Sequence, residues 1–81
     1  MITPAQLRMA RAGLGWTLID LGAKAGVNPN TISRYEGGKD VLAGTLRKIE
    51  EALQAAGVHF ITEAGGVGVQ LGEPLAPRKR R

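Results

Sequence analysis

A short polar stretch, residues 28–36 (NPNTISRYE), holds most of the side chains that could bind a partner. Asn28 can accept a hydrogen bond from a free N–H group at the start of a helix, and Pro29 suits the first helical position because no hydrogen bond is required there. The stretch therefore predicts a helix from Pro29 to about Glu36, with amide, hydroxyl and guanidinium groups on its exposed face. Either that face hydrogen-bonds a partner, or it is the solvated side of an ordinary capped helix.

No other group of residues predicts catalysis or a metal site. The chain has no cysteine, so it has no disulfide, thiolate zinc site or cysteine nucleophile. His59 is the one histidine, and no Cys, Asp or Glu pattern of a metal site surrounds it. Ser33 lacks a recognisable activating base, and the glycine-rich residues 65–69 (GGVGV) lack the lysine and the helix of a phosphate-binding loop. We expect no enzyme activity, no metal and no cofactor.

The charge of the chain is unevenly distributed. The formal net charge is +4, but residues 1–77 contain seven basic and seven acidic side chains, so the excess lies in the last four residues, RKRR. We expect residues 72–81 to form a flexible basic tail that is either simply solvated or attracted to nucleic-acid phosphates. Net charge alone is therefore weak support for a nucleic-acid partner.

The composition is that of one small globular domain, with 81 residues of which 43% are hydrophobic. No apolar run approaches the roughly 20 residues that span a membrane. The start of the sequence lacks the basic and apolar regions of a secretion signal. We expect a cytoplasmic protein with no membrane partner.

Helix-capping residues recur along the first half of the chain. Thr3 with Gln6, and Thr17 with Asp20, fit reciprocal capping pairs, each at the start of an apolar pattern with helical spacing. Gly26 can take the left-handed conformation that ends a helix. These signals predict four helices, at about residues 3–14, 17–25, 29–36 and 44–56, and a β-hairpin in residues 58–71 with its turn at residues 63–66.

Apolar residues at helical spacing identify the expected core. In the first and fourth helices these residues are Leu7, Ala10, Leu14, Leu46, Ile49 and Leu53. Trp16 is expected to belong to the same core.

The second and third helices fit a helix-turn-helix. A small residue is required where the two helices approach, and Gly22 occupies that position. A glycine is required in the turn four residues later, where Gly26 lies. The positions that must face the core are all apolar or aromatic: Leu21, Ala25, Val27, Ile32 and Tyr35.

From about Leu7 to Gly57, the sequence resembles the Cro/C1-type (XRE family) helix-turn-helix transcriptional regulators of bacteria and their phages. The resemblance is carried by the motifs LGWTLIDLGAKAGV and TISRYEGGK. It implies a mainly α, lambda-repressor-like bundle of four to five helices, here followed by a C-terminal β-hairpin and the basic tail. It also implies that the helix beginning at Pro29 lies in the major groove of double-stranded DNA.

The resemblance implies particular DNA contacts. Base edges would be read by Asn28, Asn30, Ser33 and Arg34, where Asn30 suits an adenine and Arg34 a guanine. Phosphates would be bound by Thr17, Thr31 and Lys39, together with backbone N–H groups at helix starts. The family also pairs an arginine of the first helix with a glutamate at the end of the recognition helix, and Arg11 and Glu36 occupy these positions.

The sequence departs from the family pattern at two places. Leu18 stands where many members carry a phosphate-binding glutamine, and Ile19 follows it. Neither side chain can form that hydrogen bond, and we expect both to be partly buried. Pro29 removes a side-chain contact and a backbone donor at a position that other members use to read bases, so specificity would depend on Asn30 and Arg34.

The hairpin is the predicted dimerisation element. Two strands alone are only marginally stable in water, and their free edges can pair with another chain. A homodimer joined edge to edge would bury Val58, Phe60, Val67, Val69 and Leu71 in a shared sheet. It would also present two recognition helices to half-sites about 34 Å apart. The alternative is a hairpin that folds back on its own helices.

Together these features predict a DNA-binding domain in residues 1–57, a dimerising hairpin in residues 58–71 and a tail in residues 72–81. The predicted function is a dimeric, sequence-specific transcription regulator, a repressor or autoregulator that binds a palindromic operator and associates with the bacterial nucleoid when bound. The alternative is a protein-interaction module, such as an antitoxin or antiactivator, that uses the same fold to bind a protein partner.

Overall fold

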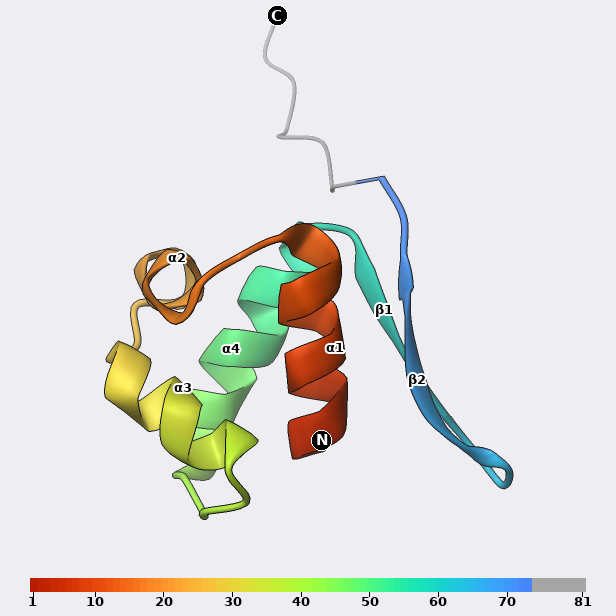
Figure 1. Ribbon diagram of the computed structural model, residues 1–81, viewed down its shortest axis with the longest axis horizontal. Helices are drawn as coiled ribbons and strands as arrows, with labels where there is room; N and C mark the ends of the chain where they lie inside the picture. The colour runs from red at the N-terminus through yellow and green to blue at the C-terminus, as the bar shows by residue number, and fades with distance from the viewer. Residues whose placement is uncertain (74–81) are drawn as a thin grey trace, which may run out of the picture.

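The structure, a computed structural model, describes residues 1–73. Its elements are α1 (Pro4–Leu14), α2 (Leu18–Ala25), α3 (Pro29–Glu36), α4 (Ala43–Ala55), β1 (Val58–Glu63) and β2 (Gly66–Leu71) (Figure 1). The predicted mainly α fold with a C-terminal β-hairpin is therefore confirmed. Most of the predicted tail, residues 74–81, lies outside the described residues.

The predicted caps set the boundaries of the first two helices. The Thr3 hydroxyl accepts the N–H of Gln6, and the Gln6 side-chain oxygen accepts the N–H of Thr3 in return. Thr17 and Asp20 form the same reciprocal pair at the start of α2. Because each pair satisfies two otherwise unbonded N–H groups, the helices begin at the residues that the sequence predicts.

The close approach of α2 and α3 depends on two glycines. A Cβ atom on Gly22 would lie 2.6 Å from the carbonyl oxygen of Val27 and 3.1 Å from Cγ of Pro29, so the backbone could not keep its position. Gly26 has φ of 70°, the left-handed conformation that reverses the chain between the helices. Both predicted glycine roles are present in the structure.

The core lies between the four helices and the start of β1. Its buried apolar residues are Ile2, Leu7, Ala10, Leu21, Ile32, Leu46, Ile49, Leu53 and Val58. Other residues that the sequence assigns to the core are only half-buried and pack around this centre: Leu14, Trp16, Ala25, Val27 and Tyr35. The helix positions were thus predicted correctly, while the depth of burial was overestimated at the ends of the helices.

The hairpin packs against α1 of its own chain, as in the alternative that the sequence left open, and this packing does not test whether its edges pair with a second copy. Figure 1 shows it beside α1, on the side away from α3, with its turn extending beyond the helices. The two strands are antiparallel and pair Phe60 with Val69. Gln6, fully buried, joins them to α1: its side-chain nitrogen donates to the carbonyl oxygens of Ile61 at 3.0 Å and Gly68 at 3.1 Å.

The five residues of the predicted dimer interface share one face of the hairpin, because cross-strand partners and alternate residues point to the same side. Val58 is 1% exposed and belongs to the core of its own chain. Phe60 and Val69 are half-buried against that core, whereas Val67 and Leu71 remain 41% and 46% exposed. The sheet has only two strands among the described residues, so both of its outer edges lack a partner strand there.

Candidate nucleic-acid interface

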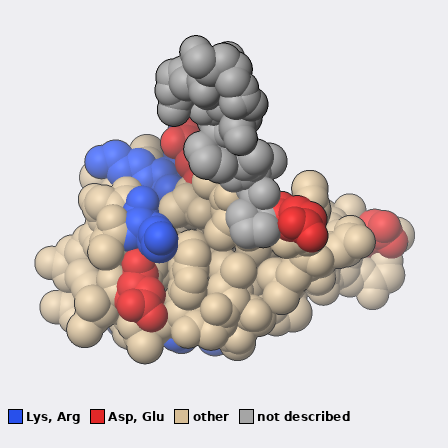
Figure 2. Space-filling view, turned by 90° about the horizontal axis from the view of Figure 1, so that it is seen from above, with Lys and Arg blue, Asp and Glu red and all other residues tan. Residues whose placement is uncertain are grey.

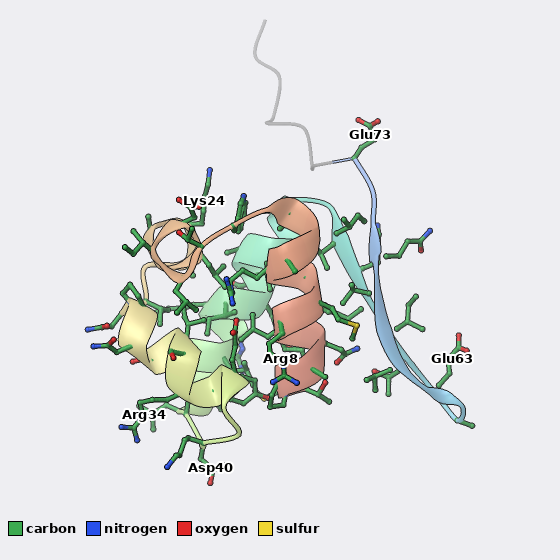
Figure 3. The ribbon with its side chains drawn as sticks, in the orientation of Figure 1. Arg8, Lys24, Arg34, Asp40, Glu63 and Glu73 are labelled. Carbon is green, nitrogen blue, oxygen red and sulfur yellow. The ribbon has the colours of Figure 1, made fainter. Side chains whose placement is uncertain are left out.

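The outer face of α3 carries exposed hydrogen-bonding side chains. Asn30, Ser33 and Arg34 are three and four residues apart, so they lie on the same side of the helix, and all three are exposed. Ile32, on the opposite side, is fully buried. Figure 3 shows the Arg34 side chain pointing away from the helical body. The structure therefore gathers the predicted base-reading residues of α3 on one accessible surface.

The first backbone N–H groups of α3 donate to oxygen atoms of the cap residue. The side-chain oxygen of Asn28 accepts the N–H of Asn30 at 2.8 Å, and its backbone oxygen accepts the N–H of Thr31 at 2.9 Å. Pro29 has no N–H group. Residues 29–31 therefore offer no free backbone N–H group to a phosphate, and Asn28 keeps its side-chain NH2 group for a partner.

The start of α2 differs in this respect. The capping pair there uses the N–H groups of Thr17 and Asp20, while those of Leu18 and Ile19 have no acceptor among the described residues. The Thr17 hydroxyl accepts a bond from Asp20, so its own hydrogen can be donated elsewhere. The hydrogen bond from the Thr17 backbone N–H is the largest cause of a lowered pKa of the Asp20 carboxyl. The phosphate contacts that the sequence assigns to helix starts can thus come from α2.

An ion pair attaches the end of α3 to α1. The Arg11 Nε and a terminal guanidinium nitrogen donate to the two carboxylate oxygens of Glu36, at 2.7 and 2.9 Å, and a third nitrogen donates to the carbonyl oxygen of Trp16 at 3.0 Å. The hydrogen bond to Glu36 is the main cause of a raised Arg11 pKa. Such a two-point contact fixes orientation as well as distance. The structure therefore brings together the pair that the resemblance implies.

Arg8 is a further support of α3 that the sequence did not reveal. Its guanidinium donates to the backbone carbonyl oxygen of Glu36, one of the carbonyl groups left unbonded where the helix ends. Arg8 lies on the exposed side of α1, where a charged side chain usually indicates only solvation. No pattern within α1 connects it with a carbonyl 28 residues away.

The remaining predicted phosphate-binding residues lie near the end of α3. Thr31 is half-buried and lies with Arg34 beside an open hollow of about 420 Å³. Lys39 is exposed, and its backbone N–H donates to the carbonyl oxygen of Arg34 at 2.9 Å. Asp40 lies at the same end of the molecule (Figure 3), which places an acidic side chain close to these basic ones.

A second open hollow, of about 560 Å³, lies between the starts of α2 and α3. We call it the α2–α3 hollow; its lining includes Arg11, Trp16, Leu18, Ile19, Pro29 and Asn30. Leu18 is half-buried and packs against the core, as the sequence predicts. The prediction of partial burial was wrong for Ile19, which is 71% exposed because it lies on the outer side of the first turn of α2.

The described surface is not strongly basic. Residues 1–73 contain seven basic and seven acidic side chains. Figure 2, seen from above Figure 1, shows basic and acidic groups next to each other on the face turned to the viewer, most of which is uncharged. Binding of DNA by this body would therefore depend on placed hydrogen bonds more than on overall attraction.

A family model for helix-turn-helix domains matches residues 7–56, more than half of the chain, and these residues include α2, α3 and the hollow between them. The chain belongs to the Cro/C1-type helix-turn-helix family. This family consists of DNA-binding transcription regulators and is not a family of enzymes, so the matched domain is a DNA-binding regulatory domain. A comparison with curated proteins found no match to this chain. Among the described helices, none has the length and apolar character needed to cross a membrane.

Proposed function

We propose that this member of the Cro/C1-type family is a dimeric repressor or autoregulator that binds a palindromic operator with α3 in the major groove. The observation that carries the proposal is the row of exposed side chains on α3, held on a helix that Arg11 and Glu36 fix to α1. A fixed helix supports base reading because each side chain then meets a defined base edge at little ordering cost.

Asn30 and Arg34 are the principal base readers in this proposal. An asparagine amide can bond both N6 and N7 of adenine, and a guanidinium can bond both O6 and N7 of guanine. Asn28 and Ser33 add single hydrogen bonds to this surface. Each two-bond contact is worth about 1–3 kcal/mol of discrimination against a wrong base.

Phosphate contacts fix the register of the helix in the groove. Thr17 and the free N–H groups at the start of α2 would bind the backbone on one side of α3, and Thr31 and Lys39 would bind it on the other. The neutral charge of residues 1–73 predicts that only a few counterions are released by the body of the domain. The four basic residues at the end of the chain would add to the salt dependence.

The dimer is proposed to form through the hairpin. Two observations support this role. Neither outer edge of the sheet has a partner strand among the described residues, and Val67 and Leu71 are exposed. Val58 would act indirectly, by holding the hairpin to its own chain. Phe60 and Val69 would close the interface from their half-buried positions.

Sedimentation of wild type and Val67→Asp tests the dimer, because a charge on an exposed strand residue opposes pairing without disturbing the core. We expect a wild-type dimer and a folded monomeric variant. A wild type that remains monomeric at micromolar concentration would reject the hairpin as the dimerisation element.

Random-site selection tests the proposed function itself. Wild-type protein should enrich an inverted repeat whose half-site centres are about 34 Å apart along the helix. An enriched site without twofold symmetry would keep DNA reading and reject the palindrome. No enrichment over the starting pool would reject the regulator proposal.

One observation favours a second function, binding of a protein partner. Ile19 exposes 71% of its surface beside Leu18, at a place where many family members present a phosphate-binding glutamine. An exposed apolar side chain can contribute to a protein interface. Failure of the selection experiment, combined with loss of a protein partner on Ile19→Ser, would favour this alternative.

A further inference from the structure

The α2–α3 hollow has apolar side chains that the proposed contacts to phosphates and base hydrogen-bonding groups do not use. Leu18 and Pro29, the first residues of α2 and α3, both line it, and Asn30 lies at its side. We propose that this hollow receives the C5 methyl group of a thymine, so that Leu18 and Pro29 read a T·A pair beside the base read by Asn30. This inference rests on the proposed function.

Neither Leu18 nor Pro29 can form a side-chain hydrogen bond with DNA, and Pro29 has no backbone N–H group. Base edges in the major groove present many polar groups but only one apolar group in unmodified DNA, the thymine methyl. An apolar wall beside a base-reading amide is therefore complementary to thymine. A cytosine at the same position has only a hydrogen at C5, so it would leave the space beside that wall unfilled and lose the apolar contact.

A phosphate bound beside the hollow would lie at its α2 edge, where Thr17 and the free N–H groups of Leu18 and Ile19 also line it. Arg11 lines it, but three of its nitrogen atoms already donate to Glu36 and to the carbonyl oxygen of Trp16. At the α3 edge, the Asn28 oxygen atoms accept the N–H groups of Asn30 and Thr31, and Pro29 has no N–H group. A phosphate placed against the side chains of Leu18 and Pro29, away from the N–H groups of α2, would lose hydration without gaining a hydrogen bond.

The wall is also fixed in position. Pro29 packs where Gly22 allows α2 and α3 to approach, with Cγ 3.1 Å from the site that a Gly22 Cβ would occupy. Leu18 is half-buried and packs against the core. Because neither residue can move far, a methyl group would enter a preformed hollow, and its contact would depend on the base at one defined position.

Deoxyuridine provides the test, because it keeps every hydrogen-bonding group of thymine and lacks only the methyl. The operator obtained by selection would be synthesised with one thymine of a half-site replaced at a time, and each dissociation constant would be measured with wild-type protein. One replacement is expected to weaken binding about fourfold, the value for removing one buried apolar carbon. Replacement of thymines outside the half-site serves as the DNA control and should have no effect.

Protein variants then locate the contact. Pro29→Ser and Leu18→Ala should each reduce the difference between thymine and deoxyuridine at the sensitive position. Gln54→Ser, a change at an exposed residue of α4 that does not line the hollow, should retain that difference. Circular dichroism would confirm that each variant is folded. The deoxyuridine series uses wild-type protein, so its result does not depend on the folding of any variant.

The outcomes separate this inference from the function on which it rests. An operator with one methyl-sensitive thymine, whose sensitivity falls in Pro29→Ser or Leu18→Ala, supports it. An operator that binds equally well with every thymine replaced overturns it while leaving the regulator proposal standing. So does sensitivity that persists unchanged in both variants. Failure to select any operator rejects the proposed function and this inference together.

Discussion

Replacement of the buried Gln6 should release the hairpin from the helices. Its side chain forms three hydrogen bonds: one accepted from the Thr3 N–H and two donated to carbonyl oxygens of the strands. A net value of about 1 kcal/mol for each bond predicts a loss of roughly 3 kcal/mol of unfolding free energy in Gln6→Met. Methionine has similar length and is apolar, so the substitution keeps most of the packing and removes the hydrogen bonds.

The loss would be a large part of the total stability, because a domain of this size is stabilised by about 4–12 kcal/mol. Urea unfolding followed by Trp16 fluorescence gives the free energy, and hydrogen exchange shows which amides lose protection. We expect exchange to increase first in β1 and β2. The matched control is Gln54→Met, since Gln54 is an exposed glutamine of α4. A loss below 1 kcal/mol in Gln6→Met, or unchanged exchange in the strands, would contradict the role assigned to Gln6.

Three further predictions concern the close approach of α2 and α3, the cap of α2 and the recognition helix. Gly22→Ala should destabilise the domain by about 1–3 kcal/mol in urea unfolding. The control is Gly44→Ala, at a helical position with open space, which should stabilise the domain by about 0.5–1 kcal/mol. Equal effects of the two substitutions would refute the close-packing explanation. Because the pKa of Asp20 is lowered in the folded state, its carboxylate adds to the free energy of unfolding above about pH 4. This contribution is lost as pH falls through the folded-state pKa. The stability difference between wild type and Asp20→Asn should therefore shrink on acidification, and a difference that stays constant from about pH 6 to pH 3 would argue against it. Arg34→Ala should weaken operator binding by about 1–3 kcal/mol and relax preference at one base pair, whereas an equal loss on random DNA would indicate a phosphate contact.

Local features of this fold could be predicted from the sequence. The pairs Thr3–Gln6 and Thr17–Asp20 join residues three positions apart, so their spacing alone identifies them. The outer face of α3 follows from helical periodicity, since the buried Ile32 determines which residues face outward. The ion pair of Arg11 required the family resemblance, because no local pattern connects it with Glu36.

Contacts between distant segments could not be predicted in this way. The Gln6 side chain reaches carbonyl oxygens 55 and 62 residues later, and nothing in its sequence neighbourhood distinguishes this role from capping alone. The N–H of Ile2 likewise donates to Glu50, 48 residues away. The exposure of Ile19 was missed because apolar residues are usually assigned to the interior, whereas its position on α2 turns it outward.

The central claim is that the outer face of α3 reads bases. The most direct measurement compares Asn30→Ala/Arg34→Ala with Gln54→Ala/Arg47→Ala, which removes one amide and one positive charge from exposed positions of α4. Dissociation constants for both variants would be measured on the selected operator and on random DNA at one salt concentration. We predict that the α3 variant loses its preference for the operator while the α4 variant keeps it. Retention of the wild-type preference by the α3 variant would contradict the claim.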